Sequence, residues 1–176
     1  MIAFVVGHHE NGKGAKSSHL GVSEWDFYKE VAYLLTSDVD IYFHNPLNRS
    51  YTSRIKETAS KLNKRNYKLV IEAHFNAATP AANGVETLYY FQSKLGKQYA
   101  QLFSFVVNQW TGIKLRNSGL KALVNKNDRG FASVFYPKAP VILIEPFFGS
   151  NKEDCEKIRD AEQMACIIDD FISRIS

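Results

Sequence analysis

Three short apolar runs constrain the fold of this chain most strongly. They cover Ile2–Val6, Leu69–Ala73 and residues 141–144. Continuous apolar, β-branched segments of this length are typical of strands that are covered on both faces of a sheet. Patterns with helical spacing lie between them. The alternation of strands and helices therefore predicts an α/β fold with a central, mixed but mostly parallel sheet.

The remaining periodic segments complete this prediction. We expect a single domain over residues 1–176, with five to six strands flanked by helices. Ser23 is expected to cap the first helix, and Asn151 the last, which should run as one helix to Ile175. The expected helices are residues 24–35, 52–66, 95–110 and 151–175, and the further strands are residues 39–44, 85–91 and a short edge strand within 115–127.

Composition excludes several classes of protein. Hydrophobic residues make up 45% and charged residues 23%, which is ordinary for a soluble globular domain. No run reaches the roughly 18 apolar residues of a membrane span. The net charge of +4 suits a polyanionic partner, such as a cell wall or a nucleic acid, without selecting one. Cys155 and Cys166 would lie about 16 Å apart on one helix, too far for a disulfide.

Four polar residues at the ends of predicted elements indicate chemistry. His8, His74 and Glu145 each end a predicted strand, and Glu24 begins the first helix. Ligands bind α/β sheets outside the carboxyl ends of the strands, so these residues can share one place. Two imidazoles and two carboxylates are what a hydrolytic zinc site needs, because zinc takes three protein ligands and a fourth acid activates water.

Each of these residues also has a simpler interpretation. A single histidine after a strand is more often a hydrogen-bonding loop residue, and Glu24 suits the first turn of a helix. Glu145 is harder to explain structurally, because it follows four apolar residues and precedes Phe147 and Phe148. A carboxylate in such surroundings needs a partner, and its pKa should be raised.

Two further residues near these histidines leave alternatives open. His9 competes with His8 for the first ligand position. Glu72 shares a strand face with His74, so it either orients that imidazole or is a buried carboxylate paired to a lysine or arginine. His44 and His19 read as structural residues without partners.

At these residues the sequence resembles the zinc-dependent N-acetylmuramoyl-L-alanine amidases of the Amidase_3 type. The ordered motifs cover nearly the whole chain. Glu72 stands where the family has serine, and Pro146-Phe147 replaces the residue and glycine that usually follow the catalytic glutamate. The matching segments are Phe4-Val5-Val6-Gly7-His8 with Gly14-Ala15, Gly21-Val22-Ser23-Glu24, Ser53-Arg54, Leu62-Asn63, Val70-Ile71-Glu72-Ala73-His74-Phe75-Asn76-Ala77, Gly84-Val85-Glu86-Thr87, Pro140-Val141-Ile142-Leu143-Ile144-Glu145 and Phe148-Gly149-Ser150-Asn151.

The resemblance implies a mechanism and a site. His8, Glu24 and His74 would hold one Zn²⁺ per chain, and Glu145 would act as general acid and base. The substrate would be peptidoglycan, cut between the lactyl group of N-acetylmuramic acid and L-alanine. Asn76 and Arg129 are candidate contacts to the substrate or to the oxyanion, although a role in a turn suits both as well.

The N-terminus reads as a core strand and not as a signal peptide. We therefore expect synthesis in the cytoplasm and action at the wall, as for a phage endolysin released by a holin, or else a catalytic domain cut from a secreted autolysin. We expect no nucleic-acid partner and no insertion into a membrane. The alternatives are another zinc-dependent peptidase or amidohydrolase and a non-catalytic wall- or nucleic-acid-binding module.

Overall fold

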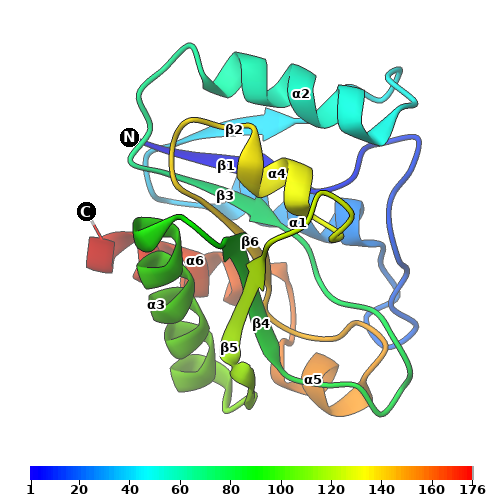
Figure 1. Ribbon diagram of the computed structural model, residues 1–176. Coiled ribbons are helices and arrows are strands. Elements are labelled where there is room, and N and C mark those ends of the chain that lie inside the picture. Colours follow the sequence, from blue (N-terminus) through cyan, green and yellow to red (C-terminus); the bar gives the residue numbers. More distant parts are fainter. Residues whose placement is uncertain (176) are drawn as a thin grey trace.

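A computed structural model describes residues 1–175 of the chain. Six strands form one sheet in the order β2-β1-β3-β6-β4-β5 (Figure 1). Strands β1, β2, β3 and β6 are parallel, whereas β4 runs antiparallel to β6 and pairs in parallel with β5. This confirms the predicted mixed, mostly parallel sheet. The strands are β1 Ile2–Val6, β2 Val39–Phe43, β3 Leu69–Ala73, β4 Val85–Tyr90, β5 Leu115–Leu123 and β6 Val141–Glu145.

Helices cover both faces of this sheet. Alternate residues of the central strands face opposite ways, so Phe4 and Ile71 pack with α1, α3 and α6, while Val5 and Val70 pack toward α2 and α4. Both faces are thereby buried, as the continuous apolar runs predict. The helices are α1 Glu24–Leu34, α2 Tyr51–Leu62, α3 Lys94–Thr111, α4 Phe131–Phe135, α5 Lys152–Lys157 and α6 Ala161–Ile175.

The caps agree with the sequence at Ser23 and at Asn151, whose side chain accepts a hydrogen bond from the backbone N–H of Asp154, but the last predicted helix is not continuous. The Ser23 side chain accepts a hydrogen bond from the backbone N–H of Asp26, as predicted. The single helix expected over residues 151–175 is wrong, because the chain breaks into α5 and α6. Asp160 accepts a hydrogen bond from the backbone N–H of Gln163, and the Gln163 side chain accepts one from Arg159. This reciprocal cap starts a new helix inside an apolar pattern that looks continuous.

Three other differences concern element ends. Helix α2 stops at Leu62 with Asn63 as its C-cap, short of the predicted residue 66. The edge strand β5 is nine residues long instead of short. The short helix α4 was not predicted. Among residues 1–175, no helix is long and apolar enough to span a membrane.

Candidate active site

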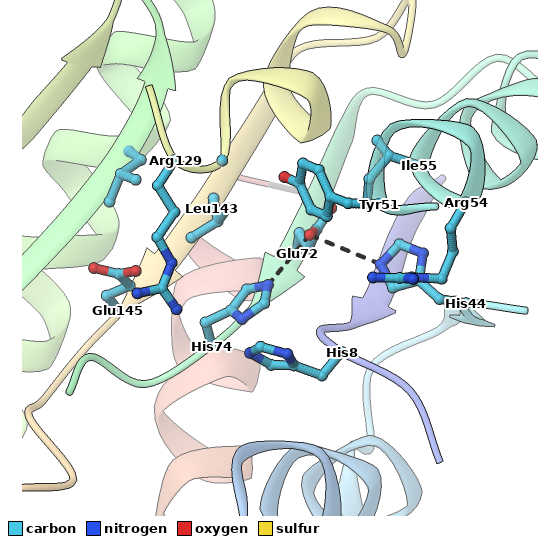
Figure 2. A pocket seen from close by; sticks show the side chains of 12 residues that line it. His8, His44, Tyr51, Arg54, Ile55, Glu72, His74, Arg129, Leu143 and Glu145 are labelled. Atoms are coloured by element: carbon cyan, nitrogen blue, oxygen red, sulfur yellow. Dashed lines mark hydrogen bonds and ion pairs between the residues drawn. The ribbon is translucent and has the colours of Figure 1, made fainter. Parts of the chain in front are cut away.

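The parallel part of the sheet brings the predicted site residues to one edge. Because β1, β3 and β6 are neighbours, His8, His74 and Glu145 emerge at the same carboxyl ends. Glu24 is the first residue of α1 and is buried beneath the two histidines. Figure 2 shows His8 and His74 next to one another, with Glu145 beyond them. The structure therefore assembles four residues that lie far apart in the sequence.

His8, Glu24 and His74 form the one group within residues 1–175 that has the spacing of a metal site. One ligand atom from each lies within 4.8 Å of the others. His8 Nε2 and His74 Nδ1 both face the same oxygen, Oε2 of Glu24, at 3.1 Å. The other oxygen of Glu24 accepts a hydrogen bond from the backbone N–H of Ala15 at 2.9 Å. Two nitrogens and one oxygen are a donor set that zinc uses in catalytic sites.

Two glycines allow the chain to pass this close to the ligand side chains. A Cβ atom on Gly14 would lie 2.6 Å from His8 Nε2 and 2.9 Å from Glu24 Oε1. A Cβ atom on Gly7 would lie 2.4 Å from His74 Nε2. Gly14 also has a φ of 76°, which favours glycine. The loop after β1 is thus built around the side chains that would hold the ion.

His74 is held on both ring nitrogens. Its Nε2 lies 3.2 Å from Oε1 of Glu72, which also accepts a hydrogen bond from Ser133 Oγ at 2.9 Å. With Nε2 donating to Glu72, loss of the Nδ1 proton would leave the Nδ1 lone pair for a metal ion, the tautomer that a metal ligand needs. The geometry thus favours the orienting role for Glu72 over pairing with a lysine or arginine.

The charges around His74 favour a cation. Burial alone would lower the pKa of His74, but hydrogen bonds and charge from Glu24 and Glu72 raise it instead. Burial would likewise raise the pKa of Glu24, yet hydrogen bonds from His74 and His8 bring it below its usual range. Two carboxylates thus stabilise positive charge between them, which is the electrostatic environment that a divalent ion needs.

Glu145 has different surroundings. Its side chain is largely buried, and Asn76 Nδ2 donates a hydrogen bond to its Oε2 at 2.6 Å. Burial raises the pKa of Glu145, and Glu86, its register partner on β4, raises it further, against opposing effects of His74 and Arg129. A raised pKa agrees with the prediction from its apolar neighbours and suits a general base. Asn76, predicted as a substrate contact, lies at the site through this bond to Glu145.

A cavity of about 350 Å³ opens between these groups. Arg129 lines it near Glu145, whereas Tyr51 and Arg54 line it from α2 (Figure 2). The Nε atom of Arg54 is buried and has no hydrogen-bond partner within residues 1–175. Such a cavity, with apolar walls and a few convergent polar groups, is typical of a small-molecule or polymer-end binding site.

Sequence reasoning gave no role in the site to several residues in or beside this cavity. His44 is not an isolated structural residue, because it lines the cavity, its Nδ1 lies 2.8 Å from Thr58 Oγ1, and its Nε2 lies 3.8 Å from Glu72. Its position at the end of a strand was the available signal. Tyr51, Arg54 and Ser133 come from helices whose orientation no local pattern reveals.

The two adjacent histidines separate in space. His8 joins the metal-site group, while His9 lines a different cavity beside Pro46 and Arg49. His8 adopts a φ of 64°, which is uncommon for a residue other than glycine. This arrangement favours His8 as the first ligand.

The α/β sheet carries two imidazoles and a carboxylate around one point, and a second carboxylate of raised pKa lines the same cavity as the imidazoles. This arrangement is typical of a metal-dependent hydrolase. The family model for N-acetylmuramoyl-L-alanine amidase, Amidase_3, matches residues 2–175. The chain belongs to this family and is an amidase of peptidoglycan, which confirms the predicted enzyme class.

Solved structures share the fold along almost the whole chain. The catalytic domain of the CD27L endolysin targeting Clostridia difficile is 26% identical, with a TM-score of 0.76 over 98% of this chain and 96% of that one. An N-acetylmuramoyl-L-alanine amidase from Clostridium difficile 630 is 22% identical, with a TM-score of 0.75 over 98% and 94%. Cwp6 from Clostridium difficile is 23% identical, with a TM-score of 0.79, and this chain covers 28% of its length. No curated protein sequence matches the chain.

Proposed function

We propose that this amidase holds one Zn²⁺ on His8, Glu24 and His74 and cuts the amide between the lactyl group of N-acetylmuramic acid and L-alanine. The observation that supports this most directly is the convergence of two imidazole nitrogens on one oxygen of Glu24, each at 3.1 Å. A bound Zn²⁺ would supply Lewis-acid polarisation of the amide carbonyl and acidify the attacking water.

The proton transfers fall to Glu145. Its raised pKa lets it accept the proton of the attacking water and then deliver it to the leaving amine of L-alanine. Asn76 orients the carboxylate by donating to Oε2, so the free Oε1 is directed to the reaction. Arg129 lines the same cavity and would contact the substrate or the oxyanion.

Glu72 has a supporting role in this proposal. It accepts the Nε2–H of His74 and so fixes both the tautomer and the plane of the ring. Ser133 donates to the same Glu72 oxygen and holds the carboxylate in place. Glu72 is therefore a positioning residue for the ligand.

Purified peptidoglycan tests the bond that is cut. The amidase should release free N-terminal alanine without new reducing ends, whereas a glycosidase would release reducing ends and a peptidase would expose N-termini other than alanine. Activity should disappear in a chelator and return with zinc. A wall-binding module without catalysis would keep its affinity for the wall in chelator and release nothing, which would contradict the proposal.

We further propose that the enzyme acts as an endolysin. Support comes from its likeness to the CD27L catalytic domain, at 26% identity over nearly the full chain. An endolysin is made in the cytoplasm and reaches peptidoglycan only when a holin opens the membrane. Expression with a holin should lyse a bacterium whose wall the enzyme cuts, while expression alone, or of Glu145→Gln with the holin, should not. Lysis without holin would instead indicate an exported autolysin.

A further inference from the structure

A second cavity, of about 390 Å³, adjoins the candidate active site. Tyr51 and Arg129 line both cavities, so the two are neighbours on either side of these side chains. We call the second cavity the aromatic groove. It lies between the start of α2, the loop of residues 126–130 and the helix α4, which are close together in Figure 1. The groove is therefore the neighbouring hollow for a substrate that extends past Tyr51 and Arg129.

The groove has exposed aromatic walls. Phe135 is 43% exposed and Tyr51 46% exposed, and Tyr136 continues the wall. Exposed aromatic side chains that gather in a hollow and are rimmed by polar groups mark a ligand-binding surface more often than a random surface feature.

The Phe135 ring is fixed in its position although it is exposed. It stacks on Phe131, with ring centroids 5.1 Å apart and 23° between the planes, and Tyr90 meets it edge-on at 5.5 Å. Packing on two sides holds the ring, so a ligand that lies on its free side would not have to immobilise it. The wall is therefore preorganised, which reduces the entropic cost of binding.

Polar groups border the aromatic wall. Lys126 and Asn127 are exposed on the loop between β5 and α4. Asp128 shapes this loop, because its carboxylate accepts hydrogen bonds from the backbone N–H groups of Val124 and Asn125, both at 2.8 Å. An amide and an ammonium group are thus presented at the edge of the aromatic surface.

We propose that the aromatic groove binds an N-acetylhexosamine ring of the glycan strand, next to the muramoyl residue whose amide is cut. This inference rests on the proposed function. A sugar ring has an apolar C–H face, which suits the electron-rich face of an aromatic ring, and hydroxyl and acetamido groups at its edge, which suit Asn127 and Lys126. The muramoyl residue at the active site is covalently joined to such sugars, so one of them must lie close to the catalytic carboxylate.

Defined muropeptides test this inference with the zinc-loaded enzyme. The first substrate is N-acetylmuramoyl-L-alanyl-D-isoglutamine, and the others carry one N-acetylglucosamine on either side of the muramoyl residue. We expect kcat/KM to be about tenfold higher for one of the disaccharides, which corresponds to about 1.4 kcal/mol. Phe135→Ala should remove most of this preference while cleavage of the monosaccharide substrate changes less than about twofold.

Two further variants separate binding from folding. Phe105→Ala removes a phenylalanine of similar exposure, 48%, on α3, so it should keep the full preference. Asn127→Ala alters an exposed loop side chain and should reduce the preference about threefold without affecting the fold. Circular dichroism and zinc content of each variant show whether the protein is intact.

The outcomes distinguish this inference from the proposed function. Equal kcat/KM for the monosaccharide and both disaccharide substrates would overturn the inference and leave the proposed amidase function intact. A preference for a disaccharide that survives both Phe135→Ala and Asn127→Ala would do the same. A preference for longer stem peptides that depends on Phe135 would assign the groove to the peptide and also overturn it. If no muropeptide releases its peptide at all, the proposed function itself fails.

Discussion

Glu24 and Glu145 are both largely buried carboxylates of one site, yet their surroundings shift their pKa values in opposite directions. Imidazoles surround Glu24, and their hydrogen bonds overcome the cost of burial and lower its pKa. Glu145 has an amide as its hydrogen-bond partner and Glu86 as its register neighbour, so burial dominates and raises its pKa. The comparison teaches that neighbours, and not burial alone, set the two pKa values. In the proposed mechanism, one carboxylate stays charged to hold a cation and the other exchanges a proton.

Replacing Glu24 or Glu145 with glutamine tests the difference between the two carboxylates most directly. Glu24→Gln removes the negative charge on which His8 and His74 converge. We expect zinc content well below one per chain and activity at background, measured by metal analysis and by release of N-terminal alanine. Retention of zinc together with activity would show that Glu24 is not a ligand.

The adjacent histidines should differ as sharply. His8→Ala should lose the metal and the activity, because His8 Nε2 belongs to the metal-site group. His9→Ala should keep both, since His9 lines another cavity. Titration with zinc against a competing chelator measures the affinity of each variant. The opposite result would move the ligand by one position along the chain.

Glu145→Gln should separate catalysis from metal binding. We expect zinc to stay near one per chain while turnover falls about 10²- to 10⁴-fold, the usual contribution of a positioned general base. The glutamine keeps the shape of the side chain and its contact with Asn76 but cannot accept a proton. Loss of zinc in this variant would mean that the ligand and base roles are exchanged between Glu24 and Glu145.

Glu72 tests how a neighbouring carboxylate supports the proposed zinc ligand His74. Glu72→Ala should weaken zinc binding about 10- to 100-fold, because His74 Nε2 loses its acceptor and the ring its orientation. Glu72→Gln retains an acceptor oxygen and should restore most of the affinity, whereas a purely structural effect would lower the stability of both variants alike. Chelator competition gives the affinity, and thermal unfolding of the metal-free proteins gives the stability. Equal zinc affinity in all three proteins would contradict the positioning role.

Much of the sheet was predictable, because its central strands are continuous apolar runs and end at the residues that form the site. The predicted strand ends located His8, His74 and Glu145 in the sequence. The predicted Ser23 cap located Glu24 at the start of α1. These signals are local in the sequence. Parallel pairing of the strands then brings the residues at their carboxyl ends close together in space.

The walls of the cavity could not be predicted in the same way. Tyr51 and Arg54 reach the site because α2 packs over one face of the sheet, and Ser133 because the five-residue α4 does so beside it. Helix α4 is too short for its periodicity to be recognised. His44 resembled a structural strand-end residue because its partners, Thr58 and Glu72, are distant in sequence.

The smallest expected effect concerns Glu86, which tests why the pKa of Glu145 is raised. Glu145 must be deprotonated to accept a proton, so kcat/KM should fall as the pH drops through its pKa. The charge of Glu86 raises that pKa, and Glu86→Gln should therefore move the acid limb of the pH profile to lower pH. Arg116 and Lys121 lie 3.7 Å from Glu86 and already offset part of its charge, so the shift should stay below about one pH unit. Glu156→Gln, an exposed carboxylate on α5, should leave the profile unchanged. If Glu86→Gln leaves the acid limb in place, burial alone sets the pKa of the base.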